Sequence, residues 1–283
     1  MFCGRNGNGV LALGIVNNIS DIKSFIIILK EVPISVEVGD KCLKQAKKFG
    51  ISPQVFDGVY GTDADKIFDT FGYKIKNNRA RAKMTLSPGV RGCVASHILL
   101  LHKCIQDDVP FLILEHDSYM IRELPSNILL GFSDVIKLDP YQPFLSDYNE
   151  SAEKKDTLSL SEKEIGFTKY KRPNIKGFKK NRTLGALFDD NGNLLKADKT
   201  NYEYFSGTYG HIVKPSGAKK IISYIEEYGL FPADWLFNGA YLDLMTTSKT
   251  IVRIHPEYNA SECKEKKLST TSNLGESYDT KRQ

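Results

Sequence analysis

Residues 85–125 constrain the fold of this chain more than any other stretch, because they join a helix to a strand with an acidic end. Ser87-Pro88 is a typical helix start, and Pro110 ends the turn that follows the helix. Residues 111–114, Phe-Leu-Ile-Leu, show no polar alternation, which is typical of a strand covered on both faces in a parallel sheet. Glu115-His116-Asp117 then follows at the carboxyl end of the strand, where open α/β sheets bind their ligands.

The residues before this stretch predict a β-α-β unit, the building block of nucleotide-binding sheets. Residues 24–29 are an apolar strand, residues 38–49 have helical composition and end at Gly50, and residues 54–56 resume an extended pattern. Further strands are predicted at three places, and a further helix between the last two: residues 135–138, 205–213 and 250–254 for the strands, 218–227 for the helix. The predicted class is therefore α/β.

The length and composition allow a substantial core. With 283 residues and 41% hydrophobic content, the chain suits one large α/β domain or two joined halves. We expect a flexible leader (1–20), a single domain (21–260) and a polar tail (261–283). Within the domain we expect a donor half (21–138), a basic insertion (139–199) and an acceptor half (200–260).

The cysteines and the apolar runs bear on location. The chain has five cysteines and no C-x-x-C pair, which favours a reducing cytoplasm over a disulfide framework or a zinc knuckle. The apolar run at residues 10–16 is too short to span a membrane. We therefore expect a cytoplasmic protein without integral membrane contact, in the host cytoplasm if a phage encodes it.

Basic residues concentrate in the insertion. The net charge is +5, and residues 167–182 carry many lysines and arginines, no acidic residue and interleaved aromatics. Phosphate-neutralising cations beside aromatics that stack on bases are elements of a nucleic-acid groove, although a solvated surface loop explains the same composition. The candidate acceptor contacts here are Lys171, Arg172, Lys179 and Arg182.

Ser96-His97 lies close to the start of the predicted central helix. Free N–H groups at a helix N-terminus favour a diphosphate or a carboxylate, so both residues are candidates for binding a phosphorylated ligand. The alternative for His97 is a buried histidine that hydrogen-bonds to a neighbour.

Two motifs follow one another in residues 85–125, Ser87-Pro88-Gly89-x-x-Gly92-Cys93-x-x-Ser96-His97 and then Leu112-Ile113-Leu114-Glu115-x-Asp117. They carry a resemblance to glycosyltransferase family 25, which includes lipooligosaccharide and collagen galactosyltransferases. The resemblance extends over residues 24–260, through the strand ending in Ile28-Leu29, the segment from Gly207-Thr208 to Lys219, and Pro232-Ala233-Asp234-Trp235. The family writes Glu-Asp-Asp where this chain has His116 in the middle, and arginines where it has Lys30-Glu31.

This resemblance implies a GT-A-like fold, in which a mostly parallel nucleotide-sugar-binding sheet is flanked by helices, with the basic insertion on the acceptor side. It also implies an inverting transfer from a nucleotide-sugar, helped by Mn²⁺ or Mg²⁺ bridging the phosphates. Asp117 is the first-choice metal ligand and a catalytic residue, with Glu115 as its partner; alternatively Glu115 only caps the sheet edge. The expected donor contacts are Ile28, Leu29, Ser96, His97, Glu115 and His116. Because side chains alternate along an extended segment, His116 is expected to point away from Glu115 and Asp117.

Asp234 is the candidate base for the attacking hydroxyl, because it lies in the segment that resembles the family's P-x-D motif. An N-cap of a following helix is the competing role. Trp235 beside it is suited to stacking on a sugar or a base and is a candidate acceptor contact.

Three functions follow as expectations. The first is a hexosyl- or pentosyltransferase that modifies a hydroxymethylated base in double-stranded phage DNA, which the basic segment favours. The second is a glycosyltransferase acting on a surface-glycan precursor. The third, from another class, is a catalytically inactive protein that binds glycan or nucleic acid.

Overall fold

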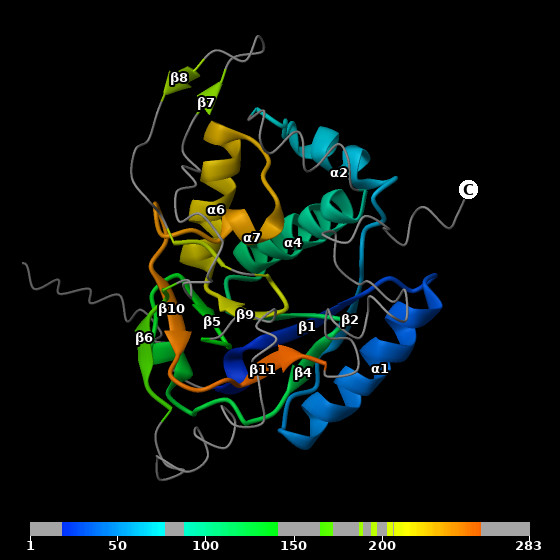
Figure 1. The fold of residues 1–283 in the computed structure, drawn as a ribbon, viewed down its shortest axis with the longest axis vertical. Helices are drawn as coiled ribbons and strands as arrows, with labels where there is room; N and C mark the ends of the chain where they lie inside the picture. Colours follow the sequence, from blue (N-terminus) through cyan, green and yellow to red (C-terminus); the bar gives the residue numbers. More distant parts are fainter. Residues whose placement is uncertain are drawn as a thin grey trace, which may run out of the picture.

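The computed structural model describes residues 19–76, 88–140, 165–171, 187–188, 194–196, 203–205 and 207–255. Its centre is a seven-stranded sheet with the order β2-β1-β3-β9-β5-β10-β6 (Figure 1). These strands are β1 (Lys23–Ile28), β2 (Gln54–Asp57), β3 (Phe111–Glu115), β5 (Val135–Lys137), β6 (Phe167–Lys169), β9 (Gly210–Val213) and β10 (Leu244–Thr247). Two small antiparallel pairs accompany it, β4 (Ser118–Met120) with β11 (Val252–Ile254) and β7 (Leu187–Phe188) with β8 (Leu194–Lys196).

Most strands of the central sheet run in one direction. β1 is parallel to both β2 and β3, and β5 is parallel to β10. β9 lies between β3 and β5 and is antiparallel to both, and β6 is antiparallel to β10 at the edge. The predicted α/β class with a mostly parallel sheet flanked by helices is confirmed.

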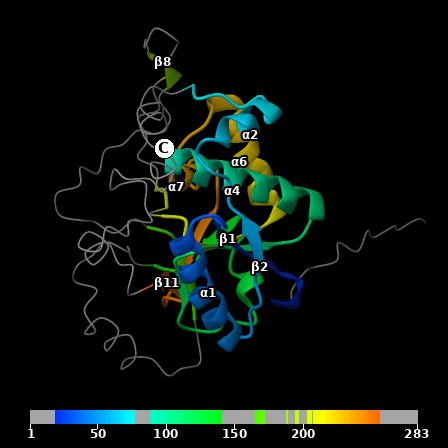
Figure 2. The same ribbon diagram turned by 90° about the vertical axis from the view of Figure 1, so that its right-hand side faces the viewer.

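Helices cover the two faces of the sheet unequally. α2 (Ala64–Phe71), α4 (Pro88–Asp107), α6 (Pro215–Tyr228) and α7 (Ala233–Leu236) lie on one face, and α1 (Pro33–Lys48) lies on the other beside the β4–β11 pair (Figures 1 and 2). Short 3-10 turns occur at Ile19–Asp21 and Ile128–Leu130. A hydrophobic core lies on each face of the sheet, and successive side chains of β3 alternate between the two cores. Phe111 and Ile113 pack toward α4, while Leu112 and Leu114 pack toward α1.

Proline and left-handed residues set the ends of the long helices. Proline is the first residue of α1, α4 and α6, where its missing N–H has no partner to lose. After α4 the chain turns through Asp108, whose φ is 51°, and reaches Pro110 directly before β3. These residues therefore set where α4 ends and where β3 begins.

The order of the first strands creates a topological switch point between β1 and β3. From β1 the chain passes through α1 to β2 on one side, and β3 then pairs with β1 on the other side. Such a switch leaves an opening outside the carboxyl ends of the two neighbouring strands, here β1 and β3. In this register Ile27 pairs with Glu115, so the acidic strand end lies at that opening.

The structure refines several predicted elements. Within the expected strand at 205–213 the structure has the strand Gly210–Val213, and within the expected strand at 250–254 it has Val252–Ile254. Within the insertion 139–199, Phe167–Lys169 forms the edge strand β6 of the central sheet. The tail 261–283 and residues 1–18 of the leader lie outside the described residues.

Candidate active site

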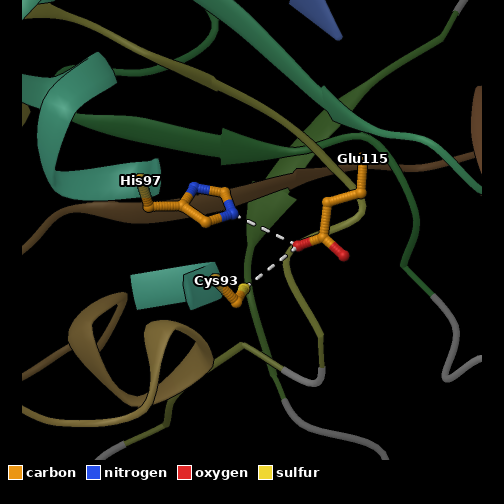
Figure 3. A group of neighbouring side chains, drawn as sticks. All are labelled: Cys93, His97 and Glu115. Atoms are coloured by element: carbon orange, nitrogen blue, oxygen red, sulfur yellow. Dashed lines mark hydrogen bonds and ion pairs between the residues drawn. The ribbon is translucent and has the colours of Figure 1, made fainter. Parts of the chain in front are cut away.

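Glu115 is the centre of the polar network at the end of β3. Its side chain is 24% exposed, and its Oε1 atom accepts hydrogen bonds from three neighbours. His97 Nε2 donates over 3.2 Å, the Cys93 thiol over 3.9 Å, and the Thr208 hydroxyl donates as well. Figure 3 shows Cys93 and His97 reaching from α4 toward the same carboxylate oxygen.

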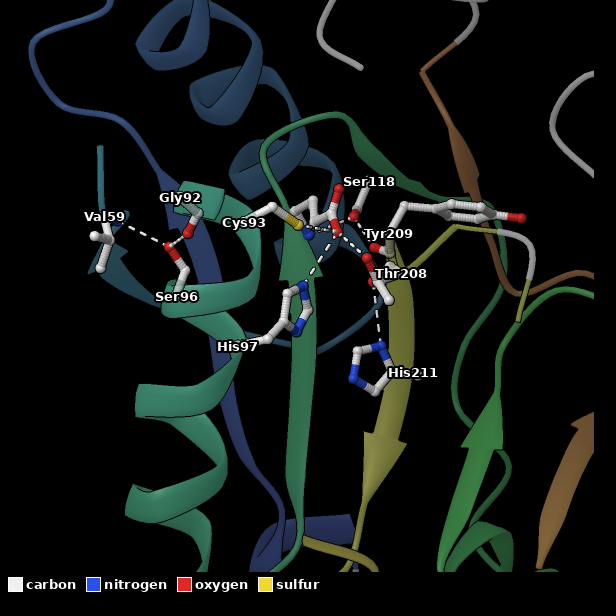
Figure 4. A network of polar contacts seen from close by, with 10 residues as sticks. Val59, Gly92, Cys93, Ser96, His97, Ser118, Thr208, Tyr209 and His211 are labelled. Carbon is white, nitrogen blue, oxygen red and sulfur yellow. Dashed lines mark hydrogen bonds and ion pairs between the residues drawn. The ribbon is translucent and has the colours of Figure 1, made fainter. Parts of the chain in front are cut away.

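Helix α4 presents two of these donors because of its periodicity. Cys93 and His97 are four residues apart and therefore lie on one helix face. Close approach of the helix to the chain after β2 requires Gly92, since a Cβ atom there would lie 2.4 Å from the Val59 carbonyl oxygen. The Ser96 hydroxyl stabilises this contact between α4 and the chain after β2, because it donates to Gly92 O and accepts from Val59 N, both over 2.8 Å (Figure 4).

The segment before β9 holds Glu115 from the opposite side. The Tyr209 carbonyl accepts hydrogen bonds from the Glu115 backbone N–H, over 3.3 Å, and from the Ser118 hydroxyl. Ser118 Oγ also accepts from the Glu115 N–H over 2.8 Å. His211 Nδ1 donates to the Thr208 carbonyl over 3.1 Å, which orients the threonine that bonds to Glu115 (Figure 4).

The surroundings keep Glu115 ionised. Burial alone opposes ionisation, but the hydrogen bond and charge of His97, the Thr208 hydroxyl and the charge of His116 lower the pKa of Glu115 to about 2. Burial lowers the pKa of His211 to about 3, with His97 contributing in the same direction, so this imidazole is neutral. The site therefore carries a fixed negative charge at neutral pH.

The causes of the raised pKa of the Cys93 thiol indicate which acidic groups lie near it. Burial raises the pKa of its thiol well above the usual value, and the charges of Glu115, Asp234 and Asp117 raise it further. These three carboxylates come from β3, from α7 and from the turn after β3. The candidate metal ligands Glu115 and Asp117 and the candidate base Asp234 therefore all raise the pKa of one thiol, although Asp234 is distant from the other two in the sequence.

Asp117 lies in the turn between β3 and β4. It is 3% exposed, and its charge raises the pKa of Cys42 on α1 as well as that of Cys93 on α4. Its carbonyl accepts a hydrogen bond from His255 N over 2.8 Å, and the buried His255 ring meets Tyr119 edge-on at 4.8 Å. His255 was not among the sequence-predicted site residues; its only signal was its place directly after the last strand.

The expected donor contacts divide between the two faces of the sheet. Ile28 is buried at the end of β1, and Leu29 N donates to Ser35 Oγ at the start of α1 over 3.0 Å. His116 lies beside α1, since a Cβ atom on Gly39 would be 3.7 Å from His116 Cβ. Glu115, by contrast, bonds to residues of α4 on the other face.

Ser96 and His97 lie more than two turns into α4, which starts at Pro88, and both are buried. The Ser96 hydroxyl is engaged by the backbone of Val59 and Gly92, and His97 by Glu115. In this arrangement both residues position other groups of the site.

Asp234 lies in the first turn of α7, and the N-cap position of that helix is Pro232. The N-cap role considered for Asp234 is therefore wrong; the side chain is half-buried. Trp235 is 3% exposed and meets the Tyr204 ring edge-on at 6.3 Å, so its indole packs in the core.

The candidate acceptor contacts of the basic insertion lie largely beyond the described part of the chain. Lys171, which follows β6, is exposed. Arg172, Lys179 and Arg182 lie outside the described residues.

Comparison with known families settles the relationship that the motif indicated. The model of glycosyltransferase family 25 (LPS biosynthesis protein) matches residues 22–237. The chain belongs to glycosyltransferase family 25. No curated protein matches it. Membership implies glycosyltransferase activity and a nucleotide-sugar donor, and the matched region contains β1, β3, α4, β9 and α7, which form the site.

One further observation concerns membranes. In the part of the chain that the structure describes, no helix has both the length and the apolar character needed to cross a bilayer.

Proposed function

We propose that this family 25 protein is a divalent-metal-dependent, inverting glycosyltransferase with a GT-A-like donor site at the carboxyl ends of β1 and β3. The observation that carries the proposal is the Glu115 carboxylate at the end of β3, on which hydrogen bonds from Cys93, His97 and Thr208 converge. Family membership supports the reaction class, and this convergence supports the assignment of roles.

The topology supports a donor site at the crevice between β1 and β3. Ile28 and Leu29 end or follow β1, and Glu115 ends β3, so the three lie at adjacent strand ends. Nucleotides bind at such switch points in open α/β sheets. We assign the nucleoside part of the donor to the β1 side and its diphosphate to the β3 side.

The acidic residues fit a hard cation in charge and ligand type. Mg²⁺ and Mn²⁺ prefer carboxylate oxygens, and Glu115 is ionised across the working pH range. Glu115 and Asp117 would hold the cation, which would offset the charge of the departing diphosphate.

Protein groups have distinct roles in the transfer. Asp234 accepts the proton of the attacking hydroxyl while the bond from the sugar's anomeric carbon to the diphosphate breaks on the opposite face. His97 and Thr208 fix the direction of the Glu115 carboxylate through their hydrogen bonds. One base and one displacement invert the configuration at the anomeric carbon.

The acceptor is best assigned to a saccharide hydroxyl of a surface-glycan precursor, because the family description names LPS biosynthesis. The transferred group is a hexose or a pentose. A second acceptor, a hydroxymethylated base in DNA, is favoured by the basic composition of residues 167–182. Lys169 and Lys171 are the described lysines of that stretch, and both are exposed, with Lys169 paired to Asp243.

Replacement of Asp234 by asparagine tests the proposal. We expect Asp234→Asn to lower the rate of sugar transfer by a factor of about 10² to 10⁴, because a positioned base contributes that much. The matched control is Asp69→Asn on the exposed side of α2. The assay incubates each protein with Mn²⁺, a panel of nucleotide-sugars and either a lipooligosaccharide core or hydroxymethylated duplex DNA, and mass spectrometry detects the glycosylated acceptor.

Each result has a defined meaning. Equal rates for Asp234→Asn and Asp69→Asn would remove Asp234 as the base. Modified DNA together with salt-dependent DNA binding would replace the glycan acceptor by DNA. Nucleotide-sugar binding without transfer or hydrolysis under any condition would favour a catalytically inactive binding protein.

A further inference from the structure

Cys93, His97 and Glu115 form a compact group of three different ligand types. The Cys93 Sγ, a His97 ring nitrogen and a Glu115 carboxylate oxygen all lie within 4.8 Å of one another (Figure 3). Two of them are on one face of α4 and the third ends β3, so regular elements hold all three. The geometry points to a Zn²⁺ site at Cys93, His97 and Glu115, which shares Glu115 with the proposed Mn²⁺ or Mg²⁺ pair Glu115 and Asp117.

Two of the three ligand-atom spacings are close to what a tetrahedral zinc ion requires, and the third, from Cys93 Sγ to a His97 ring nitrogen, lies within 4.8 Å. Zinc bonds of about 2.0 to 2.3 Å at tetrahedral angles separate nitrogen from oxygen by about 3.4 Å and sulfur from oxygen by about 3.6 Å. In the protein the His97 Nε2 to Glu115 Oε1 distance is 3.2 Å, and the Cys93 Sγ to Glu115 Oε1 distance is 3.9 Å. Shifts of a few tenths of an ångström would bring these pairs to zinc-ligand spacing.

The ligand types discriminate against the cation proposed for catalysis. Thiolate and imidazole favour Zn²⁺, whereas Mg²⁺ and Mn²⁺ favour carboxylate, carbonyl and water oxygens. Three protein ligands also leave the fourth tetrahedral position for solvent, as in open zinc sites. The partial exposure of Glu115 gives solvent a route to that position.

Zinc would replace the hydrogen bonds that hold the group together without metal. The Cys93 proton, which now points to Glu115, is released to solvent as the thiolate binds zinc. Coordination through His97 Nε2 requires the ring to carry its hydrogen on Nδ1 instead. Binding is therefore expected to strengthen as the pH rises.

Sharing of Glu115 makes zinc an inhibitor of the transferase, an inference that rests on the proposed function. A carboxylate whose oxygen is bound to zinc with Cys93 and His97 is no longer oriented toward a cation at Asp117. Zn²⁺ and the diphosphate-bound cation would then compete for one side chain. Zinc binding itself does not depend on the transferase proposal.

A metal titration of the full chain tests the site. We compare the wild type with Cys93→Ser and with the control Cys42→Ser, which removes a buried thiol on α1, in the hydrophobic core on the other face of the sheet. Zn²⁺ affinity is measured by competition with a chromophoric chelator, and Co²⁺ is used as a spectroscopic probe for a thiolate ligand. Circular dichroism verifies that each variant is folded.

We expect Cys93→Ser to weaken Zn²⁺ binding by at least about 100-fold, the upper end of the loss caused by removing an outer-shell partner. The thiolate-to-cobalt charge-transfer band should vanish in Cys93→Ser and remain in Cys42→Ser. Wild-type affinity in folded Cys93→Ser, or a cobalt adduct without that band in the wild type, would overturn the zinc site.

A second measurement separates the inhibitory role from the transferase proposal. Zn²⁺ should inhibit Mn²⁺-supported donor hydrolysis by the wild type, and Cys93→Ser should need at least about 100-fold more Zn²⁺ for half-inhibition of its own rate, matching its loss of affinity. Tight zinc binding without inhibition would overturn the competition alone. If no protein hydrolyses any donor, the proposed function fails, and the titration still decides the zinc site.

Discussion

His211 is the titratable group whose burial has the clearest consequence for stability. Its ring contacts the ring of Phe237, with centroids 4.5 Å apart, and the ring of His97, with centroids 5.5 Å apart. Its Nδ1 donates to the Thr208 carbonyl, and its buried Nε2 has no hydrogen-bond partner among the described residues. Asparagine at this position keeps a donor for Thr208 and does not titrate, so we choose His211→Asn as the perturbation.

The expected effect follows from the shifted pKa. Burial and the neighbouring His97 lower the pKa of His211 to about 3 from its usual value of 6.5. The charge of Lys137 lowers this pKa further, whereas the Thr208 carbonyl and Glu115 raise it. Between these two pH values the unfolded chain binds more protons than the folded one, so stability falls as the pH falls from about 6.5 toward 3. At pH 5 the loss from this residue is about 2 kcal/mol relative to pH 8.

Urea unfolding followed by circular dichroism at pH 8, 7, 6 and 5 measures the effect. At pH 8 the free energy of unfolding of His211→Asn should differ from that of the wild type only by the packing lost with the ring. Between pH 8 and pH 5 the free energy of unfolding of His211→Asn should rise by about 2 kcal/mol relative to that of the wild type. His102→Asn is the control, because burial lowers the pKa of His102 also, but that ring is only part-buried and should produce a smaller gain. A difference between His211→Asn and the wild type that stays constant from pH 8 to pH 5 would refute the assignment of a neutral, buried His211.

Two further substitutions test the packing and the charge of the site. Gly92→Ala places a Cβ atom 2.4 Å from the Val59 carbonyl oxygen, so we expect a loss of about 2 to 3 kcal/mol in urea unfolding, against less than about 1 kcal/mol for the control Gly239→Ala, whose nearest contact is 3.6 Å. Glu115→Gln removes a carboxylate whose pKa is lowered to about 2 from 4.5, so at pH 7 it should cost about 3 kcal/mol of stability and abolish sugar transfer. That stability is present above pH 4.5, and the two proteins should converge as the pH falls toward 2; a difference independent of pH would contradict the ionised state.

The elements that could be predicted from the sequence are those with strong local signals. β1, α1, β2, α4 and β3 have apolar runs or helical periodicity with proline starts, and all five were predicted with shifted ends. β10, with two threonines in four residues, has no such signal and was missed. β6 lies in the basic stretch that predicted an acceptor loop, and its strand form depends on pairing with β10. The antiparallel direction of β9 is likewise a tertiary property.

The same distinction applies to the site. Glu115 could be located because it ends a buried strand, and the four-residue spacing of Cys93 and His97 is a usable signal because it places both side chains on one helix face. The role of Ser96 depends on its contact with Val59, a residue 37 positions away. Such a contact exists only once α4 packs against the end of β2, so no local pattern predicts it.

The reversed strand β9 explains why the site joins residues so far apart in the sequence. Because β9 is antiparallel to β3, its start lies beside the end of β3, and Gly210 pairs with Leu114. Thr208, directly before that start, therefore bonds to Glu115, 93 residues away. A parallel strand in the same place would bring its own carboxyl end to this edge, and the threonine would lie at the opposite edge of the sheet. The direction of one strand thus determines whether the Glu115 carboxylate receives the hydroxyl that helps to keep it ionised and oriented.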